Sequence, residues 1–310
     1  MLLRKKRLHR ALELINRRLF CMKLHKIYNP IIATPFACSD NYKEFIPCDA
    51  LKPYIRCFWG TKKPVNQEKT YIKTNGIVIP DTCMDIIFHI DFTNNRIHNS
   101  FCGINDRTFS TTNYNDTEQT MFSFAIRFYA WSVPVFSEEK MCDTRNAHFD
   151  VGYHFSKIKK EMETILFEVS DIYELIPKVE KILIRNYNIK HENTLVLQAV
   201  EKILRSRGTL LVGELKNNLH ISDRQLERLF REHVGVTPKS LAAMVRYQYL
   251  WNDIIFCEQF DIQDAVYKYG YSDQAHLYHD FKKYHSMNIT DAKRYALQNV
   301  EKIQESYSDL

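Results

Sequence analysis

The sequence lacks the features that would place it in a membrane or in an oxidising compartment. No apolar run approaches the roughly 20 residues that a membrane-spanning helix needs, and the start has no long apolar core of a secretory signal. The eight cysteines stand at irregular gaps without a C-x-x-C pair, which disfavours a zinc site and a disulfide framework. We expect a cytoplasmic protein with buried thiols; whether one thiol senses redox changes stays open.

A basic surplus is present, but it is concentrated at one end. The formal net charge is +6, and nine Lys and Arg residues lie within residues 1–28 beside a single Glu. The rest of the chain is slightly acidic, so net charge gives no argument for nucleic acid. Only the local placement of charges on a docking face can support that function.

With 310 residues, of which 45% are hydrophobic, the chain has room for two folded domains. Leucines recur every three to five residues among the basic residues 1–28, which predicts an amphipathic helix. That helix is either a membrane-surface or nucleic-acid arm, or a solvated tail packed on the domain behind it. A natural start at Met22 is a third interpretation.

Residues 29–150 predict a β-rich domain, because short alternating apolar runs are separated by Pro, Asn and Asp. Residues 80–82 are expected to turn the chain between two strands, and residues 94–95 to turn a hairpin. From Met121 to Tyr129, Phe122, Phe124, Ile126 and Phe128 alternate with smaller or polar residues. This period of two predicts a half-buried strand.

Residues 151–190 predict a helical connector with helices over residues 156–169 and 171–187. Pro177 interrupts the second apolar stripe, so we expect a kink or a fresh helix start there. The polar residues 186–193 are expected to link the two domains.

Residues 195–297 contain one helix-turn-helix pattern written twice, at a repeat of about fifty residues. In the first copy a short helix over residues 210–217 precedes a helix whose start has a capping box, Ser222 with Gln225. Thr237 and Pro238 begin a long helix to about Phe256, which joins the copies. Asp261 caps the next helix, Gly270 ends it, and residues 273–284 form the second recognition helix.

The two recognition helices present different side chains on their outer faces. On the first, Arg224, Glu227, Arg228 and Arg231 are spaced so that they share one side and can enter a major groove together. On the second, the outer side has Ala275, Tyr278, His279 and Lys282.

At these residues the sequence resembles the AraC/XylS family of bacterial transcription regulators. The matching residues are Ser222, Leu226, Arg228 and Phe230, residues 235–238, Arg246, residues 270–274 and residues 281–284. The resemblance implies that residues 191–300 form a DNA-binding domain whose two units read adjacent major grooves. A tail at 301–310 follows this domain. The implied DNA contacts are Arg224, Gln225, Glu227, Arg228, Arg231, Gln274, Ala275, Tyr278, His279 and Lys282.

The sequence departs from the family pattern at several positions. Lys216 and Val266 stand where a small Ala usually packs against the recognition helix, and His220 replaces a common turn glycine. Residues 286–289 lack the Gly and Pro of the first copy, so the last helix is expected to start less sharply. His279 replaces a frequent Arg, which makes the second unit a clamp and leaves specificity to the first.

The N-terminal part has a fainter resemblance to a sensor-like domain found ahead of this DNA-binding module in some regulators. It is carried by residues 53–59, 79–85 and 124–128. Ligand candidates are Trp59, Asp81, Asp85, Arg127 and Tyr129. The alternative is that Asp81 caps a turn and the aromatic residues fill the core.

The predicted fold class is therefore α+β: a β-rich sensor-like domain, a helical linker and an all-α domain with two helix-turn-helix units. We expect a transcription regulator that acts as an activator, and its expected partners are double-stranded promoter DNA and RNA polymerase. A small-molecule effector and a homodimer stay open. No cofactor and no metal site are expected, since nothing completes a ligand set around His276 and His279.

Two other functions remain as alternatives. One is an alkyl-transferase-like DNA-repair enzyme with an AraC-type module, which would need a cysteine activated by a histidine or held on zinc. The other is a DNA-binding protein without an effector.

Overall fold

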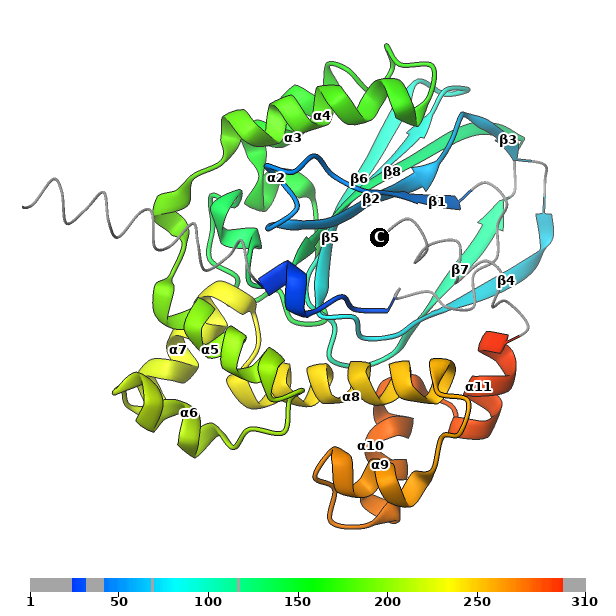
Figure 1. Cartoon of the computed structure of the whole chain (residues 1–310). Coiled ribbons are helices and arrows are strands. Elements are labelled where there is room, and N and C mark those ends of the chain that lie inside the picture. Colours follow the sequence, from blue (N-terminus) through cyan, green and yellow to red (C-terminus); the bar gives the residue numbers. More distant parts are fainter. Residues whose placement is uncertain (1–23, 32–41, 68–69, 116–117, 298–310) are drawn as a thin grey trace, which may run out of the picture.

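The computed structural model describes residues 24–31, 42–67, 70–115 and 118–297 (Figure 1). The β strands form one side of the molecule, and the long helix α8 (Pro238–Phe256) lies between them and the C-terminal helices (Figure 1). The expected α+β class, with a β-rich N-terminal part and a helical C-terminal part, is confirmed. No described helix is both long and apolar enough to cross a membrane.

The β-rich part consists of two antiparallel sheets. Its strands are β1 (Tyr42–Phe45), β2 (Ile55–Thr61), β3 (Val65–Gln67), β4 (Thr70–Val78), β5 (Cys83–Asp91), β6 (Arg96–Cys102), β7 (Phe109–Asn115), β8 (Gln119–Tyr129) and β9 (His148–Phe149). The larger sheet has the order β1-β2-β8-β5-β6-β9, with β3 also paired to β8, and β4 pairs with β7. Strand β8 is therefore central, with β2 and β3 on one side and β5 on the other.

Both turns predicted around strand β5 are present. Thr82 has a φ of 63° between β4 and β5, and the Asp81 carboxylate accepts a hydrogen bond from the Cys83 amide at 3.0 Å. At the other end, Asn95 has a φ of 52° in the β5–β6 turn. Asn adopts this left-handed region at lower cost than most residues, which is why the sequence marks the turn.

Strand β8 differs from its prediction, because it is buried on both faces rather than half-buried. Phe124, Ile126 and Phe128 are fully buried as expected, but Ala125 and Arg127 on the opposite face are buried as well. The alternation between apolar and polar residues is real, yet the second face holds a paired arginine instead of meeting water. A period of two identifies a strand but does not show what covers each face.

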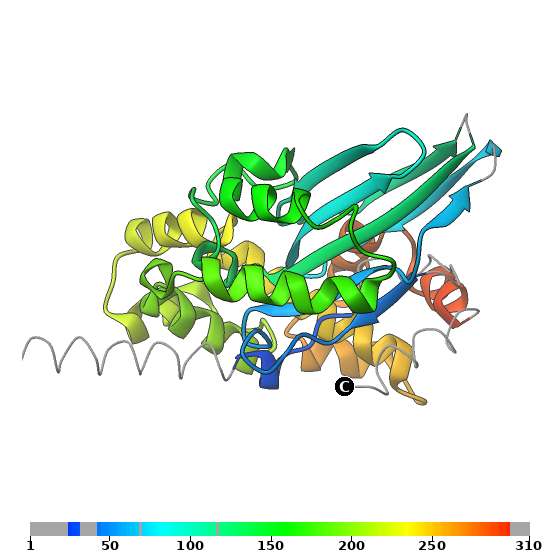
Figure 2. The ribbon, with the colours of Figure 1, turned by 90° about the horizontal axis from the view of Figure 1, so that it is seen from above.

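Three helices follow the strands and pack against one side of them (Figure 2). They are α2 (Val151–His154), α3 (Ser156–Glu163) and α4 (Ile172–Asn186). Helix α3 is shorter than predicted, and α4 runs through Pro177 without the fresh start that we considered. Pro177 has no N–H to donate to the Tyr173 carbonyl one turn earlier. Tyr173 is 58% exposed, so water can hydrogen-bond to that carbonyl instead.

The C-terminal helices follow the doubled pattern. They are α5 (Thr194–Arg205), α6 (Val212–Leu219), α7 (Asp223–Val234), α8, α9 (Ile262–Lys268), α10 (Gln274–His285) and α11 (Ile289–Leu297). Helix α8 begins after the predicted cap Thr237, whose side chain accepts a hydrogen bond from the Ser240 amide at 3.1 Å. Asp261 likewise caps α9, and Gly270 has a φ of 64° after it.

The two parts do not have separate cores, because one continuous set of buried apolar side chains runs through both. Most of the predicted basic helix, residues 1–23, lies outside the described residues. Its end is described: residues 24–27 are helical, and Leu24 is fully buried in the shared core. The segment 24–31 contacts both parts, since the Tyr28 ring lies 5.7 Å from Tyr249 on α8 and 6.1 Å from Trp131 beyond β8.

A buried amide joins this segment, the β-rich part and α8. Gln248 is 2% exposed; its Nε2 donates to the Pro80 carbonyl at 2.6 Å, and its Oε1 accepts from the Ile31 amide at 2.8 Å. Neither the Pro80 carbonyl nor the Ile31 amide lies in a helix or strand that would supply a backbone hydrogen-bond partner. Gln248 therefore satisfies two polar groups inside the core.

Closer to α7, the two parts approach each other at a glycine. Gly235 has a φ of 80°, and a Cβ there would lie 2.5 Å from the Thr144 hydroxyl and 3.1 Å from the Met141 carbonyl. The sequence predicts the helix break at this position, but the close packing of Thr144 against it follows only from the tertiary structure.

Gln248→Leu should lower the free energy of unfolding by about 2–4 kcal/mol, because it keeps an apolar side chain in place but leaves two buried backbone groups unpaired. Chemical denaturation of the full chain measures this. The matched control is Gln259→Leu, which changes an exposed glutamine after α8. Equal denaturation midpoints for the two variants would contradict the bridging role of Gln248.

Candidate nucleic-acid interface

Helix α7 presents a charged face outward while its apolar face is held in the core. The Ser222 hydroxyl accepts from the Gln225 amide at 3.2 Å and fixes the helix start, as the capping pattern predicted. Leu226, Leu229 and Phe230 are buried. The residues predicted to contact DNA from this helix are all exposed: Arg224, Gln225, Glu227, Arg228 and Arg231.

The arginines of this face differ in their partners. Arg228 lies 3.3 Å from the Glu232 carboxylate one helical turn later, and Glu232 also pairs with Lys140 of the β-rich part at 3.2 Å. Lys140 and Arg228 together hold the pKa of Glu232 below its usual range against the opposing effect of its partial burial. Arg224 and Arg231 form no ion pair with any described residue.

Helix α10 is built in the same way with a different outer surface. The Asp273 carboxylate accepts from the His276 amide at 2.7 Å and caps the helix. Leu277, Phe281 and Tyr284 are buried. Of the residues predicted to contact DNA here, Ala275, Tyr278, His279 and Lys282 are exposed, and Gln274 is half-buried.

The departures from the family pattern are accommodated by local changes. Lys216 extends to the surface and pairs with Asp223 at 2.8 Å, at the start of α7. His220 takes the left-handed conformation, with a φ of 52°, where a glycine is common. Val266 is half-buried against the core. Lys216 and Val266 therefore fit beside the recognition helices without displacing the apolar side chains that hold those helices in the core.

The prediction that the last helix, α11, starts less sharply missed a helix cap, which Asn288 supplies. Ser286 turns the chain with a φ of 60°, and the Asn288 side chain accepts from the Asp291 amide at 2.9 Å. Asn288 thus stands in for the Gly and Pro that are missing in the second copy. The signal that could have found it is the Asn three residues before an Asp.

One side chain that ties α10 to α8 carried no predicted role. Arg246 on α8 pairs with Asp280 on α10 at 2.7 Å, and its guanidinium lies 4.2 Å from the centre of the Tyr271 ring. Both members of the ion pair are largely buried, so the contact fixes how α10 lies on α8.

His285 at the end of α10 is fully buried beside aromatic rings. Its ring stacks on Phe281 at 4.9 Å between centroids, and its Nδ1 is hydrogen-bonded to the Tyr247 hydroxyl at 2.7 Å. Burial lowers the pKa of His285 to about 3. The imidazole is therefore neutral at physiological pH.

Four of the five ligand candidates in the β-rich part lie together and pair with one another. Arg127 contacts the Asp85 carboxylate through Nε at 2.9 Å and through Nη2 at 3.2 Å. The Trp59 indole N–H donates to the same carboxylate at 3.1 Å, and Asp81 lies 3.7 Å from Arg127. The ring of the fifth candidate, Tyr129, stacks on that of Trp131 with centroids 5.1 Å apart.

Sequence reasoning missed two members of this buried charge cluster. Glu44 on β1 lies 3.7 Å from Arg127 and 3.6 Å from Arg56 on β2. Burial raises the pKa of Asp81 to about 6, against the opposing charge of Arg127. Two arginines thus pair with three carboxylates inside the protein, which gives these residues a structural role whether or not a ligand binds here.

An alkyl-transferase-like enzyme needs an activated thiol, and the one Cys–His contact among the described residues does not provide it. The Cys102 sulfur lies 3.0 Å from His148 Nδ1, but burial raises the pKa of this thiol to about 12. A thiol that keeps its proton at neutral pH is a poor nucleophile. No group of three His, Cys, Asp or Glu side chains suited to a metal ion occurs in the described part of the chain.

Comparison with known proteins places family domains on both parts of the chain. Residues 215–295 match a family described as a helix-turn-helix domain, and residues 43–150 match a family described as a domain of unknown function. A search among curated proteins finds no match.

Solved structures with similar folds include the apo form of a ToxT variant from Vibrio cholerae, with 10% identity over 77% of this chain and 97% of that chain and a TM-score of 0.38. A probable AraC family transcriptional regulator from Rhodopseudomonas palustris has 20% identity over 34% of this chain and 98% of that chain, with a TM-score of 0.30. Wild-type ToxT from Vibrio cholerae with an unsaturated fatty acid bound has 11% identity over 73% of this chain and 96% of that chain, with a TM-score of 0.35. These superpositions are loose and carry no functional argument.

The C-terminal part is thus a helix-turn-helix DNA-binding domain. It spans the doubled helix-turn-helix pattern that the sequence predicted, and the domain of the second family lies on its N-terminal side.

His285 should make the protein sensitive to acid. A depressed folded-state pKa contributes stability above the unfolded value near 6.5, and this is lost as pH falls toward about 3. Lowering the pH from 7.5 to 5 should cost about 2 kcal/mol more in the natural protein than in His285→Gln. Chemical denaturation at both pH values measures the difference; equal pH dependence of the two proteins would contradict it.

Arg127→Met should destabilise the protein by about 3–5 kcal/mol, because it leaves the buried carboxylates of Asp85 and Asp81 without their cation. Arg96→Met, at an exposed position on β6, is the control for the same change of residue. Thermal and chemical unfolding of the two variants compare the effects. A loss below 1 kcal/mol for Arg127→Met would show that the cluster does not depend on this arginine.

Proposed function

We propose that the protein is a sequence-specific transcriptional regulator that reads adjacent major grooves of promoter DNA with α7 and α10. The observation that carries this proposal is the pair of capped helices, each with a buried apolar face and an exposed polar face, joined through α8. A helix of this width fits the major groove of B-DNA.

Helix α7 supplies the base-specific contacts in this proposal. An arginine such as Arg224 or Arg228 can pair with guanine O6 and N7, and Glu227 can accept from cytosine N4. Arg231 is one turn further along and suits a phosphate. In the free protein Arg228 is paired with Glu232, so DNA would have to compete with that carboxylate for it.

Helix α10 acts mainly as a clamp. Its exposed face offers Ala275, Tyr278 and His279, with Lys282 in the last turn. Ala275 can touch a thymine methyl group, while Lys282 suits a phosphate. His279 lacks the two-pronged guanidinium with which an arginine pairs to a base, which is why this helix contributes less to specificity than α7 in this proposal.

The β-rich part would modulate DNA binding in the cytoplasm, with residues 29–150 as the signal-responsive domain, 151–190 as connector and 191–300 as the DNA-binding domain. Support comes from the buried contacts between the parts, which allow a change in one to reach the other. RNA polymerase is the expected protein partner, and an effector molecule and a homodimer belong to the same proposal. Regulation by abundance alone would leave the β-rich part without a ligand.

Arg228→Ala should weaken binding to the specific operator by about 1–3 kcal/mol and relax base preference at one position. The operator would first be identified by genomic footprinting of bound sites. Fluorescence anisotropy titrations at several salt concentrations then compare specific and random DNA.

The control is Arg185→Ala on α4, because Arg185 is also an exposed arginine in a surface ion pair, with Glu161 at 2.7 Å. It should leave operator affinity unchanged. Binding that shows no sequence preference, or no decrease with added salt, would refute the proposed function.

A further inference from the structure

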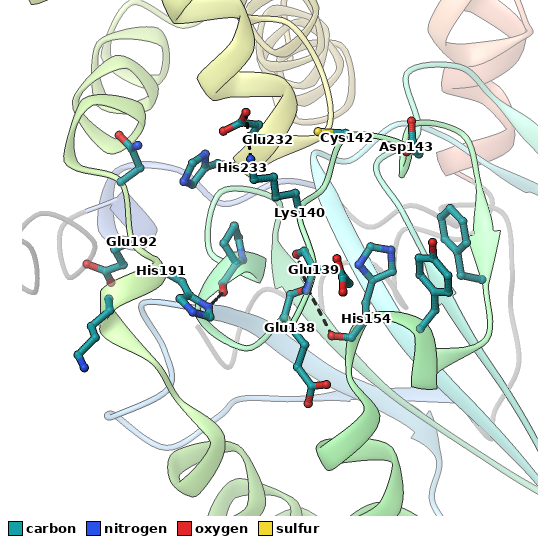
Figure 3. Close-up of a pocket in the computed structure, with 16 residues that line it drawn as sticks. Glu138, Glu139, Lys140, Cys142, Asp143, His154, His191, Glu192, Glu232 and His233 are labelled. Atoms are coloured by element: carbon teal, nitrogen blue, oxygen red, sulfur yellow. Dashed lines mark hydrogen bonds and ion pairs between the residues drawn. The ribbon is translucent and has the colours of Figure 1, made fainter.

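A pocket of about 870 Å³ opens where the β-rich part, the connector and α7 meet (Figure 3). Its walls come from the loop 137–143, from α2, from residues 190–193 and from the end of α7 at Glu232 and His233. It lies outside the buried charge cluster and reaches α7 at the end of that helix.

The pocket is rich in carboxylates. Five Asp and Glu residues line it against two lysines. Glu138 is already engaged, accepting from the Ser156 hydroxyl at 2.6 Å and from the Lys157 amide at 3.2 Å. Glu139 and Asp143 are exposed and form no ion pair with any described residue, so their charges are available to a ligand.

One wall of the pocket is aromatic. The rings of Phe149 and Tyr153 stack with centroids 5.7 Å apart and planes 16° apart, and Tyr153 is 67% exposed. The faces of such rings carry partial negative charge and attract organic cations. An aromatic wall beside carboxylates therefore suits an ammonium group with an alkyl chain better than a small hydrated metal ion.

A buried histidine supplies the second, independent observation. His154 is 3% exposed and lines the pocket beside Glu139 (Figure 3), yet its Nδ1 has no hydrogen-bond partner among the described residues. Burial lowers the pKa of His154, against the smaller opposite effect of Glu139. Nδ1 itself is enclosed by protein atoms, so the ring meets the pocket through Nε2, which as the acceptor nitrogen of a neutral imidazole can receive a hydrogen bond from an N–H donor.

We propose that this pocket is a binding site for an organic amine in its ammonium form, such as a polyamine. Glu139 and Asp143 pair with the ammonium groups, His154 accepts a hydrogen bond, and Tyr153 with Phe149 packs against the methylene chain. The opposite wall contributes Glu232.

Glu232 gives an occupant of this site contact with α7. The same carboxylate pairs with Lys140 at 3.2 Å and with Arg228 at 3.3 Å. A bound ammonium ion adds a third cation to this carboxylate and so weakens its hold on Arg228. The binding site itself does not rest on the proposed DNA-binding function, and its test contains no DNA.

The experiment is isothermal titration calorimetry of the full chain with spermidine at 150 mM NaCl. Saturable binding of about one spermidine per chain is expected. The double variant Glu139→Gln/Asp143→Asn should weaken it by roughly tenfold or more, because two charge contacts are lost. His154→Phe, which keeps a ring in a pocket formed by Phe101 and Phe155, should weaken it by roughly threefold.

Glu168→Gln is the matched control, because it removes an exposed carboxylate beyond α3 at the end remote from the pocket. It should bind spermidine as the natural protein does. A diol of similar length and MgCl₂ should give no saturable binding. The proposal is overturned if spermidine does not saturate, if the double variant binds as tightly as the natural protein, or if Mg²⁺ binds with the same dependence on Glu139 and Asp143.

Discussion

The arrangement of the two halves depends on one buried amide. Gln248 lies on α8, the helix that connects both recognition helices, and its side chain pairs with Pro80 of the β-rich part and with Ile31 of the N-terminal segment. An amide in an apolar core has to satisfy both of its ends, so α8 can occupy only positions where both partners are in reach. The β-rich part therefore sets the position of α7 and α10 through their common support, α8.

Residues of the β-rich part also form hydrogen bonds with the ends of α7 and α10. The last carbonyls of a helix have no partner within it. At α7 the Glu232 carbonyl accepts from the Met141 amide at 2.9 Å, and at α10 the Tyr284 carbonyl accepts from the Thr108 hydroxyl. Both donors belong to the β-rich part, so each recognition helix is capped by the other half of the protein. A shift of the β-rich part would therefore uncap both helices together.

Sequence reasoning reached what is decided locally. Ser222, Thr237, Asp261 and the apolar stripes identify the helices because a cap and a periodic face need only neighbouring residues. Contacts between distant segments left no such signal: no local pattern marks Gln248 as a bridge between segments or Glu44 as a member of the buried charge cluster. The paired burial of Arg127 and Asp85 follows from the register of β5 and β8, which the sequence alone does not provide.

The two helix-turn-helix copies are nearly equal as structures and unequal as surfaces. Each has a capped recognition helix, a buried apolar stripe and a left-handed residue at one of its turns, and the missing Gly and Pro of the second copy are replaced by Ser286 and Asn288. The difference lies outside the core, where α7 exposes three arginines and α10 exposes His279 and Lys282. Since folding constrains only the inner faces, the outer faces are free to diverge. The unequal roles proposed for the two helices therefore arise from surface chemistry, while their shared geometry comes from the inner faces.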